Sequence, residues 1–366
     1  MLLAAAREKI GRIEARAYTL PTDRPESDGT LAWDSTTIVV VRVEGGGRQG
    51  TGYSYTSPGA VAVIQGEVAA ALLDQDVMET GRCRRALDAA LRNLGGAGIA
   101  QMAASAVMAA LLDLKARLLE IPLATLLGAC RESIPVYGSG GFTSYTLHEL
   151  AGQLGKWADE GISMVKMKIG RNPKADPERI RVAREAIGPG VALFVDANGA
   201  YSRKQALALT DTLLRYRVTW YEQPVHYRDL EGYRMLRDRV PAPVEIASGE
   251  YGFVLDDFRR IVEAGAVDVL QADATRCGAD CFLEAAALCR AFHLPLSAHT
   301  APSLHLPLCC AAEPARHLEY FHDHVRIEKM LFDGVREPVG GLLAPDPDRP
   351  GIGIELKKKD AERYAV

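Results

Sequence analysis

The second part of the chain alternates short β-rich runs with longer helical stretches, and this rhythm restricts the possible folds more than any other feature. The β-rich runs lie at residues 164–169, 192–196, 219–222, 244–247, 267–271, 296–298 and 318–321. Helical patterns fill the intervals, as at residues 179–186, 203–216, 256–264 and 281–292. Repeated strand–helix units form parallel sheets. About seven or eight such units predict an α/β fold with a closed barrel.

The first part of the chain has a different pattern, with strands first and helices afterwards. Residues 12–20 and 36–43 are predicted as strands, and the polar, turn-rich residues 21–34 lie between them. From residue 60 to 127 the pattern is helical, and residues 102–113 are rich enough in Ala, Leu and Met to form a largely buried helix. This order of elements predicts an α+β domain.

These patterns divide the chain into three parts. We expect the N-terminal α+β domain over residues 1–130 and a barrel over residues 131–335, because the strand–helix rhythm starts after Pro135. Residues 336–366 are rich in proline, glycine and charged residues. We expect this tail to fold back onto the first domain.

Charge, hydropathy and cysteine content limit the expected partners and location. The net charge of −4 gives no reason to expect a nucleic acid or an anionic membrane as partner. No stretch approaches the roughly 20 apolar residues of a membrane helix, and the apolar run Met1–Ala6 is shorter than the roughly 7–15 residues of a signal-peptide core. Seven cysteines, an odd number, favour a cytoplasmic protein without a disulfide framework. Cys277, Cys281 and Cys289 have helical spacing, and we expect them to pack in a core; the alternative interpretation is a metal or redox cluster.

Three carboxylates, Asp196, Glu222 and Glu250, follow three successive β-rich runs, each about one strand–helix unit after the one before. Every unit of a barrel returns the chain to the same rim, so the acids should meet at the C-terminal rim, where catalytic residues collect. Converging carboxylates repel each other unless a cation lies between them, and oxygen ligands favour a hard ion. Any one of them alone is better explained as a helix N-cap. Three in register predict one Mg²⁺ ion per subunit.

Lys166 and Lys168 end an earlier β-rich run, one unit before Asp196. In a strand both lysine side chains point to the same side, with Met167 opposite. Two neighbouring ammonium groups lower each other's pKa and burial lowers it further, so one lysine can be a neutral base near pH 7. A Lys-x-Lys pattern by itself usually marks a solvated edge strand, so its position one unit before the acids carries the prediction.

Asp273 and His299 close the two β-rich runs after Glu250. Adjacent strand ends can bring their side chains into contact, and Asp273 would then fix the imidazole tautomer and favour its protonated form. The other seven histidines have no comparable placement. Glu319 ends the next run. The alternative interpretations are a structural histidine and a solvated surface glutamate.

The order of these residues resembles the mandelate racemase subgroup of the enolase superfamily, in which Lys or His bases work with Mg²⁺ ions. Two further marks are similar, the helix with Ala103, Asp113 and Arg117 and the C-terminal turn Asp348–Gly353. The resemblance covers nearly the whole chain. It implies a (β/α)7β modified TIM barrel with an N-terminal α+β capping domain, assembled as a homo-oligomer.

The resemblance also implies a role for each residue. The metal ligands correspond to Asp196, Glu222 and Glu250, the base to Lys168 with Lys166 as its electrostatic neighbour, the acid or base on the opposite face to His299 with Asp273, and the group that hydrogen-bonds the substrate carboxylate to Glu319. Loops near residues 21–34 and 53–58 of the cap would close on the substrate.

The implied reaction starts with removal of the proton alpha to the carboxylate of a small hydroxy acid or sugar acid. If His299 returns a proton to the alpha carbon, the enzyme is a racemase or epimerase. If it protonates a departing beta-hydroxyl, the enzyme is a dehydratase, and lactone cycloisomerisation is a third outcome. We expect dehydration of an acid sugar, because the polar residues around Arg24 and the hydroxyls of Tyr53 and Tyr55 suit a polyol. A non-catalytic barrel that only binds metal and ligand is the alternative from another class.

Overall fold

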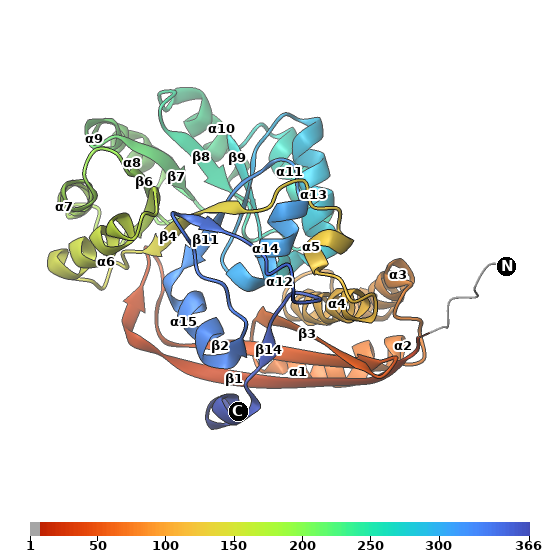
Figure 1. Cartoon of the computed structure of the whole chain (residues 1–366). Coiled ribbons are helices and arrows are strands. Elements are labelled where there is room, and N and C mark those ends of the chain that lie inside the picture. Colours follow the sequence, from red (N-terminus) through yellow and green to blue (C-terminus); the bar gives the residue numbers. More distant parts are fainter. Residues whose placement is uncertain (1–7) are drawn as a thin grey trace.

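A computed structural model describes residues 8–366, so the run Met1–Ala6 lies outside the described residues. Figure 1 shows a parallel barrel and, along one side of it, a long antiparallel hairpin with its own helices, which together form the cap. The C-terminal segment runs from the barrel to the outer side of this hairpin, where Ala365 pairs with Tyr18. The cap is therefore joined to the barrel twice. The chain leads from the cap into the barrel, and the C-terminal segment returns from the barrel to the cap.

Eight parallel strands between residues 134 and 321 form the barrel. They are β4 (Ile134–Gly140), β5 (Met164–Lys168), β6 (Ala192–Asp196), β7 (Val218–Glu222), β8 (Glu245–Ser248), β9 (Val269–Ala272), β10 (Leu296–Ala298) and β11 (Ala315–Phe321). Each strand pairs with the next one in the chain, and β11 pairs with β4, which closes the sheet. The predicted closed barrel is confirmed, and β4 is the strand that the sequence pattern did not show.

Between residues 134 and 321, helices connect consecutive barrel strands and cover the barrel from outside (Figure 1). They are α6 (Leu147–Asp159), α7 (Asp176–Ile187), α8 (Arg203–Ala208), α9 (Thr210–Arg215), α10 (Leu230–Arg239), α11 (Leu255–Glu263), α12 (Ala274–Cys277), α13 (Ala279–Ala291) and α14 (Pro302–Ala311), and α15 (His322–Leu331) follows the last strand. Helix α6 illustrates their construction, since Thr146 and Glu149 cap its start reciprocally and Leu150 and Leu154 are buried in the core. The helix predicted over residues 203–216 is divided into α8 and α9.

The sheet of the cap consists of β1 (Ile10–Ser27), β2 (Ala32–Gly45) and β3 (Arg48–Tyr55). The first two strands are longer than predicted, so residues 21–34 are mostly strand and not a loop. The pairing of β1 with β2 is irregular between Pro21 and Glu26 and then resumes. Proline cannot donate a ladder hydrogen bond, which accounts for the irregularity. We call residues 21–34 the hairpin arm.

Seven helical segments between residues 59 and 126 pack on this sheet or beside it. They are α1 (Gly59–Val63), a π-helical turn (Ile64–Val68), α2 (Ala69–Leu72), α3 (Thr80–Leu91) with a 3₁₀ turn (Arg92–Leu94), α4 (Ile99–Leu118) and α5 (Leu123–Leu126). Helix α4 lies so close to β3 that a Cβ at Gly52 would approach the carbonyl oxygen of Ala106 to 2.3 Å. The expectation that no stretch approaches a membrane helix is wrong for α4 by length and composition, but 78% of its apolar window is buried in the structure, as in a core helix.

The C-terminal segment contacts both the barrel and the cap. It contains β12 (Phe332–Asp333), β13 (Leu342–Leu343), β14 (Glu355–Leu356), α16 (Lys358–Ala361) and a 3₁₀ turn (Glu362–Tyr364). Strand β13 pairs with β4 of the barrel. The Ile352 N–H donates to Oδ1 of Asp113 in α4 at 2.6 Å. The seven cysteines are free, and Cys130 is the exposed one.

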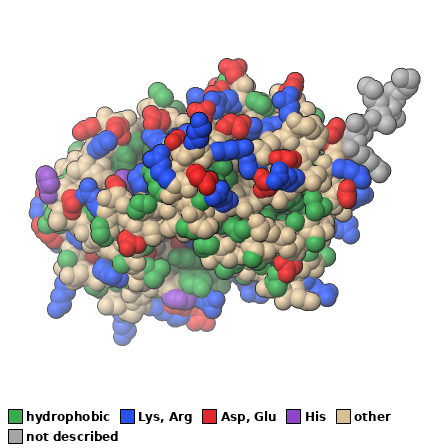
Figure 2. Space-filling model, turned by 90° about the horizontal axis from the view of Figure 1, so that it is seen from below, with side chains coloured by type: hydrophobic (Ala, Val, Ile, Leu, Met, Phe, Trp, Pro, Cys, Tyr) green, Lys and Arg blue, Asp and Glu red, His purple; other side chains and the backbone are tan. Residues whose placement is uncertain are grey.

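The face of the molecule seen from below carries mixed charges. In Figure 2, Lys and Arg side chains are interspersed with Asp and Glu side chains and with small groups of hydrophobic ones. Some of the exposed charges are paired, as Arg16 is with Glu362 at 2.7 Å on the outer side of the hairpin. Exposed pairs of this kind contribute about 0–1 kcal/mol each. The cap is therefore stabilised mainly by its buried apolar face, which includes Val39, Val41 and Val43.

Candidate active site

Three carboxylates meet at the carboxyl ends of three neighbouring barrel strands. Asp196 is the last residue of β6, Glu222 is the last residue of β7, and Glu250 lies just after β8. All three are almost fully buried, and one carboxylate oxygen from each lies within 4.8 Å of the others. Gly249 permits this approach, because a Cβ there would come within 2.3 Å of the carbonyl oxygen of Gln271. The structure thus brings together the three acids that the sequence spacing singled out.

The charges of these acids fit a divalent cation. Burial and the neighbouring carboxylates, Asp196 first among them, raise the pKa of Glu222 to about 8. Burial also opposes ionisation of Asp196, but Lys168 and Lys166 together hold the pKa of that carboxyl below its usual value. Carboxylate oxygens at this spacing are the ligands that Mg²⁺ prefers, and an ion that keeps some positions free can also bind substrate oxygens. Asp196, Glu222 and Glu250 are therefore able to hold such an ion.

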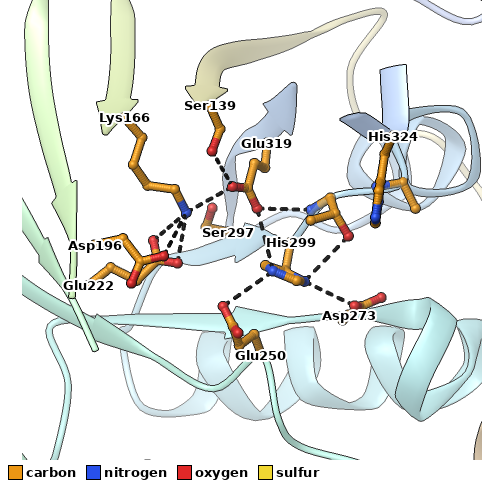
Figure 3. A network of polar contacts seen from close by, with 12 residues as sticks. Ser139, Lys166, Asp196, Glu222, Glu250, Asp273, Ser297, His299, Glu319 and His324 are labelled. Atoms are coloured by element: carbon orange, nitrogen blue, oxygen red, sulfur yellow. Dashed lines mark hydrogen bonds and ion pairs between the residues drawn. The ribbon is translucent and has the colours of Figure 1, made fainter. Parts of the chain in front are cut away.

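Lys166 and Lys168 lie on β5, and both ammonium groups pair with carboxylates of the site. Figure 3 shows Lys166 reaching from β5 toward two groups of acids, and its Nζ lies 2.7 Å from Oε1 of Glu222 and 2.8 Å from Oε1 of Glu319. Lys168 donates to Oδ2 of Asp196 at 2.5 Å. Burial alone would lower the pKa of both lysines, but the surrounding carboxylates raise it. The expectation of lowered lysine pKa values is wrong for the charges of the protein alone, because the acids outnumber the two ammonium groups. A divalent cation held by the carboxylate trio would offset much of this negative charge and lower the pKa of both lysines.

His299 lies between two carboxylates on the other side of the site (Figure 3). Its Nδ1 is 3.0 Å from Oδ2 of Asp273, and its Nε2 is 3.2 Å from Oε2 of Glu250. The other oxygen of Asp273 accepts a hydrogen bond from the Thr275 N–H at 2.8 Å, which fixes the carboxylate. Burial would lower the pKa of His299, but Glu250, Glu319 and Asp273 raise it. The imidazole is therefore held in one orientation and favoured in its protonated form.

Glu319 connects the two sides of the site. Its Oε1 accepts a hydrogen bond from the Ser139 hydroxyl at 2.6 Å, and its Oε2 accepts one from the Thr300 N–H at 3.0 Å. Thr300 has a φ of +55°, in the left-handed region that a threonine rarely adopts. Although burial opposes ionisation, Lys166, His299 and Lys168 hold the pKa of Glu319 well below its usual value. Glu319 is thus an ionised group whose oxygens already accept several hydrogen bonds.

A cavity of about 220 Å³ lies at this rim, between the barrel and the cap. The barrel contributes Lys168, Glu250, Asp273, His299 and Glu319 together with Asn198, Tyr251, Thr275, Arg276, Thr300, Phe321 and His324, and the cap contributes Asp28, Trp33, Thr36 and Tyr55. Asp28 and Trp33 belong to the hairpin arm. Most of these side chains carry hydrogen-bonding groups, so the cavity is suited to a polar small molecule.

The three residues predicted to contact the substrate lie in different surroundings in the structure. Tyr55 lines the cavity. Tyr53 is fully buried beside it, and its hydroxyl donates to Oε1 of Glu328 at 2.5 Å. Arg24 is exposed and pairs with Glu149 of α6 at 2.7 Å. The predictions for Tyr53 and Arg24 therefore need correction, because a tertiary partner outside the cavity occupies each polar group.

His324 lines the cavity although the sequence pattern did not single it out. Its ring stacks on that of Tyr55, with ring centroids 3.4 Å apart and an interplanar angle of 11°. Burial lowers the pKa of His324 to about 3, so the ring is neutral and differs from His299. The expectation that no other histidine has a comparable placement is wrong for His324. It lies in the first turn of α15, beyond the strand end where the spacing argument stops. Its position shortly after Glu319 in the sequence was the available signal.

Two domain families match most of the chain. Residues 149–361 match the family described as enolase C-terminal domain-like. Residues 13–128 match the mandelate racemase/muconate lactonizing enzyme N-terminal domain. These two segments correspond to the barrel with its tail and to the cap.

Similar proteins include enzymes of more than one activity. D-galactarolactone cycloisomerase of Agrobacterium fabrum is 28% identical, over 96% of this chain and 97% of that protein. L-talarate/galactarate dehydratase of Salmonella typhimurium is 29% identical, over 74% of this chain and 71% of that protein. A crystal structure of that dehydratase with Mg and L-lyxarohydroxamate has a TM-score of 0.90 at 27% identity and covers 100% of this chain and 95% of its own.

The solved structure of a mandelate racemase/muconate lactonizing enzyme-like protein from Rubrobacter xylanophilus is 51% identical to this chain. Its TM-score is 0.96, and the match covers 98% of this chain and 100% of that one. The arrangement of cap, barrel and tail is therefore shared along the whole length.

Proposed function

The chain belongs to the mandelate racemase/muconate lactonizing enzyme family of the enolase superfamily, and we propose that it dehydrates an acid sugar with the help of Mg²⁺. The observation that carries this proposal is the presence of Lys168 and His299 in one polar cavity, beside the buried trio Asp196, Glu222 and Glu250. A base and an acid on separate strands around one substrate are what removal of an alpha proton and departure of a beta-hydroxyl require.

Each residue of the site has its own role in the proposed reaction. Lys168 takes the proton from the carbon alpha to the carboxylate. His299 gives a proton to the departing beta-hydroxyl, which leaves as water, and Asp273 holds the imidazole tautomer through its 3.0 Å contact with Nδ1. Lys166 keeps positive charge next to Lys168, as its electrostatic neighbour. Mg²⁺, when bound by the carboxylate trio, supplies positive charge that stabilises the negative charge developing on the substrate carboxylate.

The proposed substrate is an acid sugar because of what lines the cavity. Asp28 and Thr36 from the cap and Asn198 from the barrel offer hydrogen-bonding groups to hydroxyls. Arg276 adds a cation to the lining, and its guanidinium donates to the carbonyl oxygen of Glu250 at 2.9 Å. These groups would be poorly matched by an aryl substrate, since buried polar groups without partners cost free energy.

Cycloisomerisation of a sugar lactone is the second candidate. The Agrobacterium cycloisomerase aligns with 96% of this chain, whereas the Salmonella dehydratase aligns with 74%. The same Lys168 and His299 also serve a racemase or epimerase if His299 returns a proton to the alpha carbon. Family membership does not choose among these outcomes, because one site geometry serves all of them.

The products distinguish the candidates. The protein would be incubated with Mg²⁺ and a set of mono- and diacid sugars and their lactones, and the products analysed by mass spectrometry. Dehydration lowers the mass by one water and gives a 2-keto-3-deoxy acid, whereas cycloisomers and epimers keep the mass of the substrate. Lys168→Ala is the inactive control. A mass-conserving product would overturn dehydration, and absence of both turnover and alpha-hydrogen exchange across the set would favour a non-catalytic barrel.

A further inference from the structure

Three potential metal ligands meet where the hairpin arm contacts the barrel, outside the carboxylate trio. Asp23 and Glu26 lie on β1, and His322 is the first residue of α15. One carboxylate oxygen of each acid and one ring nitrogen of the histidine lie within 4.8 Å of one another. Nε2 of His322 lies 3.1 Å from Oδ2 of Asp23. The cluster therefore offers two oxygen donors and one nitrogen donor from two separate parts of the fold.

Glu26 supplies a second and independent indication of a ligand. Its side chain is only 1% exposed, and its Oε2 accepts a hydrogen bond from the Trp33 indole at 2.9 Å. Its Oε1 is buried and has no hydrogen-bond partner among residues 8–366. A buried carboxylate oxygen without a donor is costly, so a cation there would stabilise the fold.

The neighbouring cations are already engaged. Arg24 pairs with Glu149 at 2.7 Å. Arg326 pairs with Asp323 at 2.9 Å, and Asp323 also accepts a hydrogen bond from the Thr36 hydroxyl. Within the described part of the chain, Asp23 pairs with the imidazole of His322, and Glu26 forms no ion pair. Two ionised carboxylates beside one imidazole carry a net negative charge that a divalent cation would balance.

We propose that Asp23, Glu26 and His322 bind a divalent transition-metal cation of the zinc class, at a site separate from the Mg²⁺ site. The imidazole nitrogen favours Zn²⁺ over Mg²⁺, because Mg²⁺ selects oxygen donors. Three protein ligands with water in the fourth position form a common Zn²⁺ geometry. The site goes beyond the proposed dehydration and does not depend on it.

The cation would fasten the hairpin arm to the barrel next to the cavity. Trp33, which is bonded to Glu26, lines the cavity, and so does Asp28 two residues after Glu26. His322 follows directly after Phe321, another lining residue. A metal held between these segments would restrict the cap wall of the cavity and leave the catalytic groups in place.

Zinc binding to the full chain at saturating Mg²⁺ tests the site. Calorimetric titration should show one Zn²⁺ equivalent for the unaltered protein, and zinc should raise its Tm. Glu26→Gln and His322→Asn should each weaken binding by more than about 10–100-fold and lose the Tm increase, since even outer partners of a metal contribute that much. His148→Asn, which alters an exposed histidine, is the matched control and should bind like the unaltered protein.

The same titration on a variant of the carboxylate trio shows whether zinc binds at this site and not at the trio. In Glu222→Gln the proposed Mg²⁺ site is disrupted, yet one Zn²⁺ equivalent should still bind and should still be lost on adding His322→Asn. Circular dichroism and the Tm without metal show whether each variant is folded. If the unaltered protein takes up no zinc, or if Glu26→Gln or His322→Asn binds it with the same affinity, the proposal is overturned.

Discussion

The hydroxyl of Tyr53 donates a 2.5 Å hydrogen bond to Oε1 of Glu328, and both side chains are fully buried. The other oxygen of Glu328 accepts from the Ser303 N–H at 3.0 Å and from the Ser303 hydroxyl at 2.6 Å. Strand β3 of the cap is thus joined to α14 and α15 of the barrel through one carboxyl group. Burial raises the pKa of Glu328 to about 7, although its hydrogen bonds to Ser303 and Tyr53 lower it.

This raised pKa predicts a loss of stability with rising pH. The folded protein binds the Glu328 proton more tightly than the unfolded chain, whose pKa is near the ordinary 4.5. The contribution is therefore fully present below about pH 4.5 and is lost as pH rises through about 7. A shift of this size corresponds to about 3 kcal/mol. The free energy of unfolding of Glu328→Gln, measured with denaturant, should rise relative to the unaltered protein across that interval.

The exposed Glu67 offers the control for this comparison. Glu67→Gln should give a pH profile of stability parallel to that of the unaltered protein, because that side chain is exposed to solvent in the folded protein. A difference curve for Glu328→Gln that stays flat between pH 4.5 and 7 would contradict the buried titration.

Removal of one trio carboxylate should abolish metal binding without unfolding the barrel. Glu222→Gln keeps the shape of a side chain that contacts Lys166 and accepts from the Trp220 indole at 2.9 Å. It removes a charged ligand, so Mg²⁺ affinity measured by calorimetry should fall by more than the about 10–100-fold typical of an outer partner. The far-ultraviolet circular dichroism should not change. Glu231→Gln, at an exposed position, should bind Mg²⁺ normally, and full turnover after exhaustive chelation would rule out the metal requirement.

The placement of the main site residues was predictable because it follows from the period of the fold. Each strand–helix unit returns to one rim, so the spacing of Asp196, Glu222 and Glu250 was enough to bring them together. The contact between Asp273 and His299 follows from adjacent strand ends in the same way.

Properties that depend on tertiary neighbours were not predictable in the same way. The pKa of Lys168 is raised because several carboxylates surround it, whereas the sequence pattern showed only the adjacent Lys166. Tyr53 and Tyr55 lie on the same strand and have the same side chain, but only the structure shows that the hydroxyl of Tyr53 is hydrogen-bonded to Glu328. His324 follows the last barrel strand, and its stack on Tyr55 joins two segments from opposite ends of the chain.

Ligand binding should protect the hairpin arm from proteolysis. Leu31, at its tip, is 64% exposed, while the neighbouring Asp28 and Trp33 line the cavity. An acid sugar bound with Mg²⁺ would contact Asp28 and Trp33 and reduce local opening, so chymotrypsin cleavage at Leu31 should slow several-fold. Segment 53–58 should be protected with it. Cleavage at the exposed Phe292, far from the cap in sequence, is the internal reference, and equal protection at both positions would argue against a specific role for the arm.

The two proposed proton-transfer groups should separate in an isotope-exchange experiment. Lys168 lies on β5 and His299 follows β10, so they approach a substrate in the cavity from different strands. If Lys168 takes the alpha proton, His299→Asn should lose dehydration but still exchange the alpha hydrogen of the substrate in D₂O. Lys168→Ala should lose both, because no base remains on its side. Each loss should be about 10²–10⁴-fold in rate, and NMR of the substrate follows the exchange.

The reverse pattern has its own meaning. A substrate of the opposite configuration at the alpha carbon would present its proton to His299, and then Lys168→Ala would keep exchange while His299→Asn would lose it. That result would overturn the assignment of base and acid but would leave the fold and the carboxylate trio untouched.

Asp273→Asn distinguishes a positioning effect from a chemical one. It keeps the size of the group 3.0 Å from Nδ1 of His299 but no longer stabilises the imidazolium, so it should slow dehydration with the same preserved exchange as His299→Asn. Unchanged dehydration in Asp273→Asn would show that His299 needs no orienting carboxylate.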